Sequence, residues 1–299
     1  MAHASAQRVP RHPHQVQKPR RGARFALGYW RARATTLMPE LPEVETVVRT
    51  VAPFLTGRRV LEARFTSKFV TPGNRTALAA RLKGRSIISV RRRGKFIVIE
   101  LDQGTLAIHL GMTGNLLAQG KAGDHTHGVF TLDDGILLYN DPRQFGRIEW
   151  SAGPAKRVAK LGPEPLEISL EEFQKRMKRR ARVKPLLMNQ AFLAGMGNIY
   201  VDESLFRAGI HPLAIAAKLS AARVARLHQV IRELLTEAIE HRGSTISDYR
   251  DAKGDSGSFQ LRHLVYGREG QACAVCGTPI KKILVGQRGT HYCPKCQRR

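Results

Sequence analysis

The sequence has few acidic residues. Its 299 residues include 24 Asp and Glu against 50 Lys and Arg, which gives a formal net charge of +26. This deficit argues against an ordinary enzyme of small-molecule metabolism and indicates a polyanionic partner, either nucleic acid or an anionic membrane surface. Long apolar runs are also missing, since none approaches the ~18–20 residues of a transmembrane helix. Nucleic acid is therefore the favoured partner, and no membrane association is expected.

Residues 1–37 contain no acidic residue at all, but they contain eight Lys and Arg and show no apolar periodicity. This composition predicts a disordered basic extension. It lacks the apolar stretch of a secretory signal, whereas an Arg-rich organelle presequence stays an alternative. The remaining 42 basic and 24 acidic residues still give a net charge of +18, so the basic character belongs to the folded part.

Cysteine is equally scarce, and its placement is informative. The four cysteines all lie in the last 27 residues, as two CxxC pairs separated by 16 residues: Cys273, Cys276, Cys293 and Cys296. This spacing is typical of one tetrahedral Zn²⁺ site rather than of disulfides. We therefore predict one structural zinc ion. The segment between the pairs carries a basic surface that suits phosphate: Lys281, Lys282, Arg288 and His291.

Residues 38–160 show one helical pattern followed by strand patterns. A helix is expected from Pro42, with apolar positions from Val44 to Leu55 at helical spacing and Gly57 as its end. Short apolar segments punctuated by turn residues then predict strands: Ile87–Arg91, Phe96–Leu101, Leu106–Leu110, Val129–Leu132 and Ile136–Tyr139. Such a series indicates a sandwich or a barrel.

The second half of the chain has helical patterning. Leu161–Pro165 is interpreted as a linker, and Ser169 with Glu172 has the spacing of a capping box that opens a basic helix. Helical segments are expected around 186–192, around 200–206 and from about Ser220 to His241. The predicted domains are 38–160, 161–266 and a zinc module over 267–299, in an α+β multidomain fold.

Three further segments suit nucleic acid, although each has an ordinary structural explanation. Seven of the ten residues 175–184 are Lys or Arg, and Arg91–Arg93 precede Lys95 in a second basic run. With the zinc module and the net charge, these runs favour phosphate binding over merely solvated faces. Gly195–Asn198 precedes a helix, whose N-terminus binds phosphate readily, but a plain turn explains it equally well. Asp141–Gly146 places Arg143 beside Phe145, a pair that can wedge into a base stack.

Six ordered motifs together resemble the bacterial formamidopyrimidine-DNA glycosylase family, the repair enzymes for oxidised purines. The resemblance covers about residues 39–297. It rests on PELPEVET, HLGMTG, DPRQFG, LGPEPL, GMGNIYVDESLFRAGIHP and the four-cysteine finger, which start at Pro39, His109, Asp141, Leu161, Gly195 and Cys273. The family implies an N-terminal β-sandwich with a leading helix, a helical domain with a helix–two-turn–helix motif, and a zinc hairpin.

The resemblance also implies roles for single residues. Pro39 would be the nucleophile, Glu40 the acid beside it, Lys95 an assisting lysine and Arg288 the finger arginine of the later elimination. Met112, Arg143 and Phe145 match residues that fill the gap left by an extruded base. DNA contacts are implied for His125, Arg143, Arg179 and Asn198, and the basic run adds Lys184 as a phosphate contact. The expected partner is damaged double-stranded DNA, bound by a monomer in the bacterial cytoplasm.

Two departures from the family pattern bear on these expectations. Gln144 stands where family members often have a second basic residue, which weakens one expected phosphate contact. The other departure is the 37 residues ahead of Met38, because the family's nucleophile is the chain's own amino terminus. We expect the working chain to begin at Pro39, with residues 1–37 as upstream sequence translated in error, a presequence cut at residue 38 being the alternative.

Two rival functions stay open on the sequence alone. An endonuclease VIII-like glycosylase shares the fold and chemistry but prefers oxidised pyrimidines, and PELPEVET favours the purine branch over a PEGPE-type start. A non-catalytic DNA-binding protein with a blocked terminus is the rival of another class. Covalent trapping separates the second rival from an amine catalyst.

Overall fold

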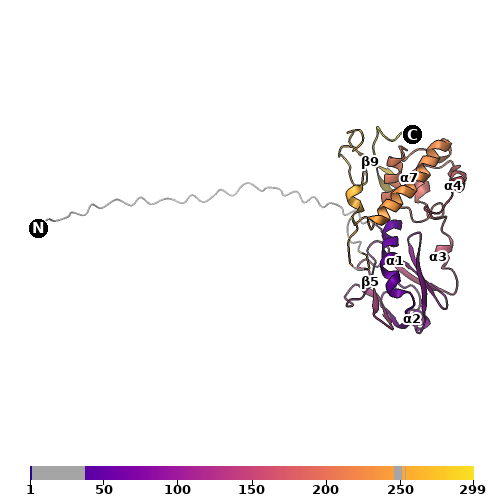
Figure 1. Cartoon of the computed structure of the whole chain (residues 1–299), viewed down its shortest axis with the longest axis vertical. Helices are drawn as coiled ribbons and strands as arrows, with labels where there is room; N and C mark the ends of the chain where they lie inside the picture. The colour runs from indigo at the N-terminus through magenta and orange to yellow at the C-terminus, as the bar shows by residue number, and fades with distance from the viewer. Residues whose placement is uncertain (2–37, 246–250, 253) are drawn as a thin grey trace. The chain divides into compact units, whose positions relative to one another are not determined.

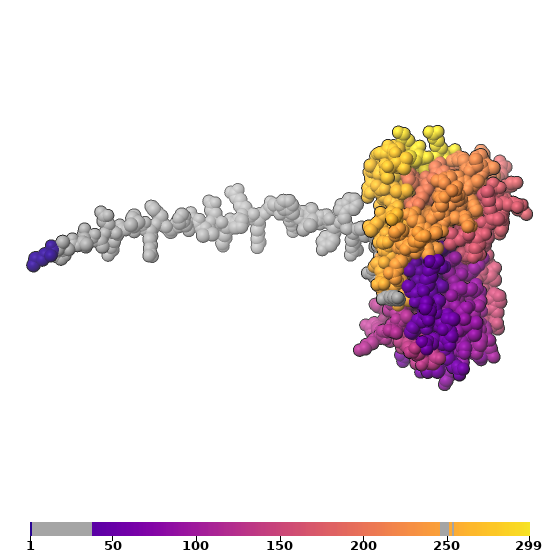
Figure 2. Space-filling model, viewed as in Figure 1, coloured from indigo at the N-terminus to yellow at the C-terminus, as the bar shows by residue number. Residues whose placement is uncertain are grey.

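Helix α1 (Leu41–Leu55) connects the two halves of the molecule. The computed structural model describes residue 1 and residues 38–245, 251–252 and 254–299, and the described residues from Met38 onward belong to one compact unit. The predicted disordered extension falls on residues that lie outside this description, apart from Met1. Leu41, at the start of α1, belongs to a C-terminal core, whereas Val44 through Leu55 belong to an N-terminal core. Figure 1 shows α1 beside α7, and Figure 2 shows the two halves in contact there.

The predicted ends of α1 are confirmed by its capping contacts. Pro42 lies in the first turn, where its missing N–H costs nothing. Val44, Val47, Val51 and Leu55 are fully buried, as their helical spacing predicts. At the other end the Thr56 N–H bonds Ala52 O, and Gly57 takes the left-handed φ of 84° that a side chain would disfavour.

The N-terminal half is a sandwich of two antiparallel four-stranded sheets, so the predicted fold is confirmed. One sheet has the order β1-β6-β7-β5 and the other β2-β3-β4-β8. The strands are β1 (Val60–Phe65), β2 (Ile87–Arg93), β3 (Phe96–Leu101), β4 (Thr105–His109), β5 (Asn115–Ala118), β6 (Thr126–Leu132), β7 (Ile136–Asn140) and β8 (Arg147–Ser151), with α2 (Arg75–Leu82) between β1 and β2. All five predicted strands are present. Strands β1, β5 and β8 were not predicted, because polar residues interrupt them or they are short.

The C-terminal half is helical, as expected. It contains α3 (Lys156–Ala159), α4 (Leu170–Met177), α5 (Val183–Met188), α6 (Asn198–Arg207), α7 (Ala221–Glu240) and two short 3₁₀ helices, η1 (Ala216–Lys218) and η2 (Phe259–Arg262). Ser169 caps α4 by accepting from the Glu172 N–H, and Ser220 caps α7 in the same way through the Arg223 N–H. The segment 189–197 forms the two turns between α5 and α6.

The chain ends in a β-hairpin of β9 (Lys281–Val285) and β10 (Arg288–Tyr292). A small apolar cluster of Phe206, Val265 and Ile280 joins two of the cysteines beneath it. Across the residues that the structure describes, no helix is long and apolar enough to cross a membrane.

Candidate active site and DNA-binding surface

Glu40 lies where the two halves meet, at the N-terminus of α6. Its Oε1 accepts a hydrogen bond from the Ile199 N–H at 3.1 Å, and its Oε2 accepts a longer one from the Tyr200 N–H at 3.4 Å. The Leu41 N–H next to it bonds Gly195 O. The α6 N-terminus therefore binds the protein's own carboxyl group. This arrangement corrects the hypothesis that the glycines at 195–197 expose the helix end to a phosphate.

The Glu40 carboxyl is suited to proton transfer near neutral pH. Only 2% of the residue is exposed, and burial raises the pKa of its carboxyl to about 7, although the nearby Lys95 ammonium and the two α6 N–H groups oppose the shift. A group with a pKa near the working pH can both hold and release a proton. The role of an acid, which the family resemblance implies for Glu40, requires such a pKa.

Gly197 allows Lys95 to approach the same carboxyl group. A Cβ at residue 197 would lie 2.2 Å from the Glu40 Cδ and 2.5 Å from the Lys95 Nζ, so a side chain there would displace both groups. Burial lowers the pKa of the Lys95 ammonium; the carboxyls of Glu40 and Glu43 oppose that shift, and the Arg288 charge adds to it. Two of the four predicted catalytic residues, Glu40 and Lys95, therefore lie side by side. Arg288, exposed at the start of β10, is near enough for its charge to act on Lys95.

The fourth, Pro39, immediately precedes Glu40 and is buried. In this chain its nitrogen forms the peptide bond with Met38. A proline nitrogen in a peptide bond has no N–H and no basic lone pair.

Lys184 does not contact phosphate, and the prediction that it does is wrong. Its side chain is fully buried and its Nζ lies 2.6 Å from Asp202 Oδ1, while also donating to Gly289 O at 3.3 Å. Asp202 Oδ2 accepts from the His291 N–H at 2.8 Å. Because Gly289 and His291 belong to β10, this buried ion pair fixes the hairpin strand that begins with Arg288. His291, counted in the basic surface from sequence, is likewise buried.

Asn198 also contacts the hairpin. Its Nδ2 donates to Gly289 O at 3.0 Å, which is the same carbonyl that Lys184 reaches. Its Oδ1 is buried and has no partner among the described residues. Asn198 therefore connects the start of α6, where Glu40 lies, with the strand that carries Arg288.

Sequence reasoning gave no separate role to Glu43, which organises the other side of the site. Its Oε2 accepts from the Glu40 N–H at 2.9 Å, and its Oε1 accepts from the Tyr200 hydroxyl at 2.5 Å and the Ser244 N–H at 2.7 Å. Ser244 Oγ in turn contacts His263 Nε2 at 3.0 Å. Glu43 stands three residues after Glu40, which is the spacing of a capping box and was the available sequence signal. Its partners come from distant segments that no local pattern connects.

The predicted wedge residues share one surface made of two loops. Phe145 is 51% exposed, unusual for a large aromatic, and the Arg143 guanidinium lies 4.8 Å from the centre of its ring. Met112 is half-buried in the adjoining loop. A Cβ at Gly111 would lie 2.5 Å from the Phe145 carbonyl carbon, so the two backbones are in direct contact.

Asp141 holds these two loops together from below. It is fully buried, and its carboxylate accepts from the Thr113 hydroxyl at 2.5 Å and from the Gly146 N–H at 2.8 Å. Gln144 contributes as well, because its Oε1 accepts from the Ser67 hydroxyl at 2.6 Å. The half-buried Gln144 thus bonds within the protein, at the position where family members often have a second basic residue.

The remaining predicted DNA contacts, His125 and Arg179, are exposed. Arg179 lies over the Phe192 ring at 5.7 Å. Their contacts with phosphates stay predictions.

The four cysteine sulfurs fit one zinc ion. All four Sγ atoms lie within 4.8 Å of one another, with Cys273 and Cys296 at 3.9 Å and Cys276 and Cys293 at 3.5 Å. A tetrahedron with Zn–S bonds of ~2.3 Å has edges of about 3.8 Å. The residues would hold one structural zinc ion that joins the two turns under the hairpin.

Comparison with known proteins agrees with this geometry along the chain. Residues 38–148 match the formamidopyrimidine-DNA glycosylase N-terminal domain, residues 161–250 its H2TH domain, and residues 270–299 the zinc finger found in FPG and IleRS. The chain is 55% identical over 265 residues to the formamidopyrimidine-DNA glycosylase of Solibacter usitatus, covering 88% of this chain and 100% of that protein. The Herpetosiphon aurantiacus enzyme of the same name is 46% identical over 274 residues, covering 87% and 100%.

Solved structures give the same result. The MutM (Fpg) protein from Thermus thermophilus has a TM-score of 0.79 and 40% identity, covering 87% of this chain and 98% of that one. A Lactococcus lactis FPG variant, solved in complex with a Fapy-dG containing DNA, has a TM-score of 0.81 and 35% identity, covering 87% and 100%. The chain therefore belongs to the formamidopyrimidine-DNA glycosylase family.

Proposed function

We propose that this protein is a bifunctional base-excision repair enzyme, which removes oxidised purines such as 8-oxoguanine and formamidopyrimidines from duplex DNA and then cleaves the abasic site. The observation that carries this proposal is the Glu40 carboxyl, buried on the α6 N-terminus beside Lys95 and directly after Pro39. Family membership supports both activities, and a Lactococcus lactis relative binds DNA with an abasic site.

Recognition requires the damaged nucleotide to leave the helix. Extrusion costs a few kcal/mol, which a damaged pair partly offsets. Met112, Arg143 and Phe145 would fill the vacated space, because the two loops that Asp141 joins present them on one exposed surface. His125 and Arg179 would hold the neighbouring phosphates.

The chemistry then needs a free amine on Pro39. A terminal amine has a pKa near ~8, against ~10.4 for lysine, so more of it is unprotonated at neutral pH. The amine would attack C1′ of the sugar as the bond to the base breaks, and the Glu40 carboxyl would protonate the ring oxygen as the C1′–O4′ bond opens. The product is an iminium ion between Pro39 and C1′.

The iminium ion makes the C2′ proton acidic. Loss of that proton expels the 3′ phosphate in β-elimination, and a second elimination expels the 5′ phosphate. Lys95 and Arg288 would stabilise the negative charge of the leaving phosphates. This role is supported by the position of Lys95 beside Glu40 and by the influence of the Arg288 charge on Lys95. The zinc ion has a structural role in this scheme and takes no part in a chemical step.

We further propose that the catalytic chain begins at Pro39. An amide nitrogen cannot form an iminium ion, and the family match starts at residue 38. Removal of a methionine that precedes a small residue would free the proline amine. We expect such a chain to act as a monomer on the DNA of the bacterial cytoplasm.

Borohydride trapping tests the function and the start site together. A 39–299 form incubated with an 8-oxoguanine duplex should become covalently attached to DNA, whereas an unprocessed 1–299 form should not. Mass spectrometry of the native protein should show an N-terminal proline. Efficient trapping by an intact 1–299 chain would contradict the mechanism and assign the nucleophile to Lys95 or another amine. If neither form traps, the protein binds DNA without catalysis.

Oxidised pyrimidines are a second candidate substrate class. A Lactococcus lactis relative with 35% identity has been solved with an oxidized pyrimidine containing DNA. Single-turnover rates on 8-oxoguanine and thymine glycol duplexes, compared for the same 39–299 protein, decide between the classes. A faster rate on the pyrimidine lesion would overturn our assignment.

A further inference from the structure

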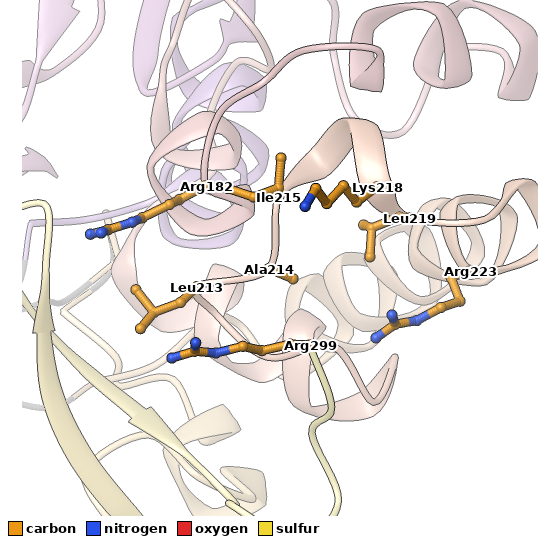
Figure 3. A pocket seen from close by; sticks show the side chains of 8 residues that line it. All are labelled: Arg182, Leu213, Ala214, Ile215, Lys218, Leu219, Arg223 and Arg299. Carbon is orange, nitrogen blue, oxygen red and sulfur yellow. The ribbon is translucent and has the colours of Figure 1, made fainter.

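A hollow of about 370 Å³ lies in the C-terminal half, and none of the candidate active-site residues lines it. Four basic side chains surround it, contributed by α5's N-cap, η1, α7 and the chain end: Arg182, Lys218, Arg223 and Arg299. Figure 3 shows these side chains around Ala214. No acidic residue lines the hollow among the residues that the structure describes. We call this site the basic pocket.

The floor of the basic pocket is aliphatic. Leu213, Ile215 and Leu219 line it together with Ala214 (Figure 3). The chain path is fixed there, because the Val183 N–H bonds Ala214 O at 2.8 Å and the Ala216 N–H bonds Ala181 O at 2.9 Å. The pocket is therefore a formed feature of the fold, with a volume in the usual range for ligand sites.

The cations around this floor are available to a ligand. Arg223 donates to two backbone carbonyls, Arg298 O at 2.8 Å and Gly209 O at 3.4 Å, which fixes its guanidinium at the rim. Arg182, Lys218 and Arg299 line the same hollow, and none of them forms an ion pair within the described residues. Such a cluster carries an electrostatic cost of mutual repulsion that an anionic ligand would relieve.

We propose that the basic pocket binds an acidic peptide segment of a partner protein, anchored by an apolar side chain. Carboxylates would pair with the four cations, and a leucine-sized or larger apolar side chain would cover the aliphatic floor. Such a ligand uses both the cations and the aliphatic floor of the basic pocket. A duplex backbone would use the cations alone, and an unstacked base would need an aromatic platform, which none of the lining residues provides.

The position of the basic pocket and the net charge of the chain also restrict which ligand can occupy the pocket. None of the candidate catalytic or wedge residues lines the pocket, so the proposed partner does not need the active site in order to bind. The chain's own residues 1–37 cannot be the occupant because they carry eight basic and no acidic residues, and a second copy carries the same net charge of +26.

The test measures fluorescence anisotropy of a labelled hexapeptide, four acidic residues followed by leucine and phenylalanine, with the full chain. Binding should weaken about tenfold or more in the Lys218→Glu/Arg299→Glu variant. It should weaken comparably when serine replaces both apolar peptide residues, or in Leu213→Ser. The Arg59→Glu/Lys83→Glu variant is the matched control, since both residues are exposed in the N-terminal half and the charge change is the same. The control variant should bind the peptide like the unmodified chain. Since every variant carries residues 1–37, a difference between variants cannot come from that segment.

A duplex containing an abasic-site analogue is measured in parallel. Lys218→Glu/Arg299→Glu should leave duplex affinity as in the matched control, and the duplex should not displace the peptide. No peptide binding below ~1 mM, equal peptide binding by all variants, or a duplex that displaces the peptide and is weakened by the same variant would each overturn the proposal. The last result would assign the pocket to DNA. None of these outcomes depends on the glycosylase activity.

Discussion

Glu40 and Glu43 are one helical turn apart, yet their carboxyl groups have different partners. Glu40 faces the α6 N-terminus and Lys95, whereas Glu43 bonds Tyr200 and Ser244. Burial raises the pKa of both carboxyls. The Glu40 carboxyl accepts from two α6 N–H groups, and its pKa of about 7 makes its proton available for chemistry, while Glu43 holds the structure around it.

The raised pKa of Glu40 predicts a pH-dependent cost in stability. Burial raises the pKa of its carboxyl from the ordinary value of 4.5 to about 7 in the folded chain. Below pH 4.5 both states keep the proton and no cost arises. Between pH 4.5 and about pH 7 the unfolded chain loses the proton and the folded chain keeps it. The free energy of unfolding therefore falls, by about 3 kcal/mol in total above pH 7. Glu40→Gln should remove this loss.

Urea unfolding at about pH 5 and about pH 8 measures this pH-dependent loss of stability. The stability of Glu40→Gln relative to the unmodified chain should rise by roughly 2–3 kcal/mol between the two pH values. Glu62→Gln, in an exposed position on β1, is the control for the loss of one carboxylate. Parallel pH profiles for Glu40→Gln and the unmodified chain would contradict the prediction.

The Lys184–Asp202 ion pair predicts a positioning effect on Arg288. Asp202→Asn leaves a buried ammonium without its counter-charge, so we expect a loss of about 3–5 kcal/mol in the free energy of unfolding. The exposed Arg58–Asp134 pair has a similar distance of 2.6 Å, and Asp134→Asn should cost less than ~1 kcal/mol.

A double variant separates stability from positioning. Lys184→Met/Asp202→Leu removes both charges and should recover most of the stability, because an apolar pair of similar volume replaces a buried ion pair at little cost. It still lacks the contacts to Gly289 and His291. Its affinity for an abasic-site duplex should therefore stay low. Full recovery of affinity along with stability would show that the pair has no positioning role.

At the scale of single elements, the hairpin depends on the zinc ion more than on its own core. Among the residues that the structure describes, its apolar cluster includes three buried residues besides cysteines, Phe206, Val265 and Ile280. Such a small cluster cannot offset the entropy of ordering about thirty residues. Arg288 thus depends on four thiolates for its position.

Loss of one zinc ligand should therefore cost both metal and DNA affinity. We expect Cys293→Ser to lose the zinc ion, measured by atomic absorption, and to bind an abasic-site duplex at least about tenfold more weakly. The far-ultraviolet circular dichroism of the sandwich and helices should change little. Duplex affinity retained in a zinc-free protein would contradict a role of the hairpin in DNA binding.

At the scale of the whole molecule, the net charge of +18 that the chain carries without residues 1–37 and the wedge loops contribute differently to DNA binding. Exposed cations displace counterions from phosphates, so they set the dependence of affinity on salt. The wedge acts on base stacking, which depends little on salt. Lys184 makes no contribution to the salt dependence, because its charge is buried against Asp202.

Two variants test this division. Arg179→Ala should lower the slope of log affinity against log salt by about 1. Phe145→Ala should slow base removal while the slope stays nearly unchanged. Duplex affinities from about 50 to 200 mM salt, with single-turnover rates at one salt concentration, provide both quantities. An equal change of slope in both variants would refute the separation of roles.

The sequence by itself determined the local features. Helix α1, five strands, the cap at Ser169, the start of the long helix near Ser220 and the four zinc ligands follow from spacing and residue type, because each depends on neighbours within a few positions along the chain. The ordered motifs likewise identified Glu40, Lys95, Arg288 and the wedge residues as candidates.

Only the tertiary structure decided what those residues contact. Lys184 and Arg179 belong to one basic run, but Lys184 is buried against Asp202 and Arg179 is exposed. Gln144 bonds Ser67, and the α6 N-terminus binds Glu40 rather than a phosphate. The physical reason is that burial and electrostatic partners come from distant segments, as with Glu40 and Tyr200, which are 160 residues apart in sequence. The local sequence pattern does not show which residues interact at such separations. The pKa of Glu40 and the burial of the Lys184 side chain are therefore properties of the folded chain.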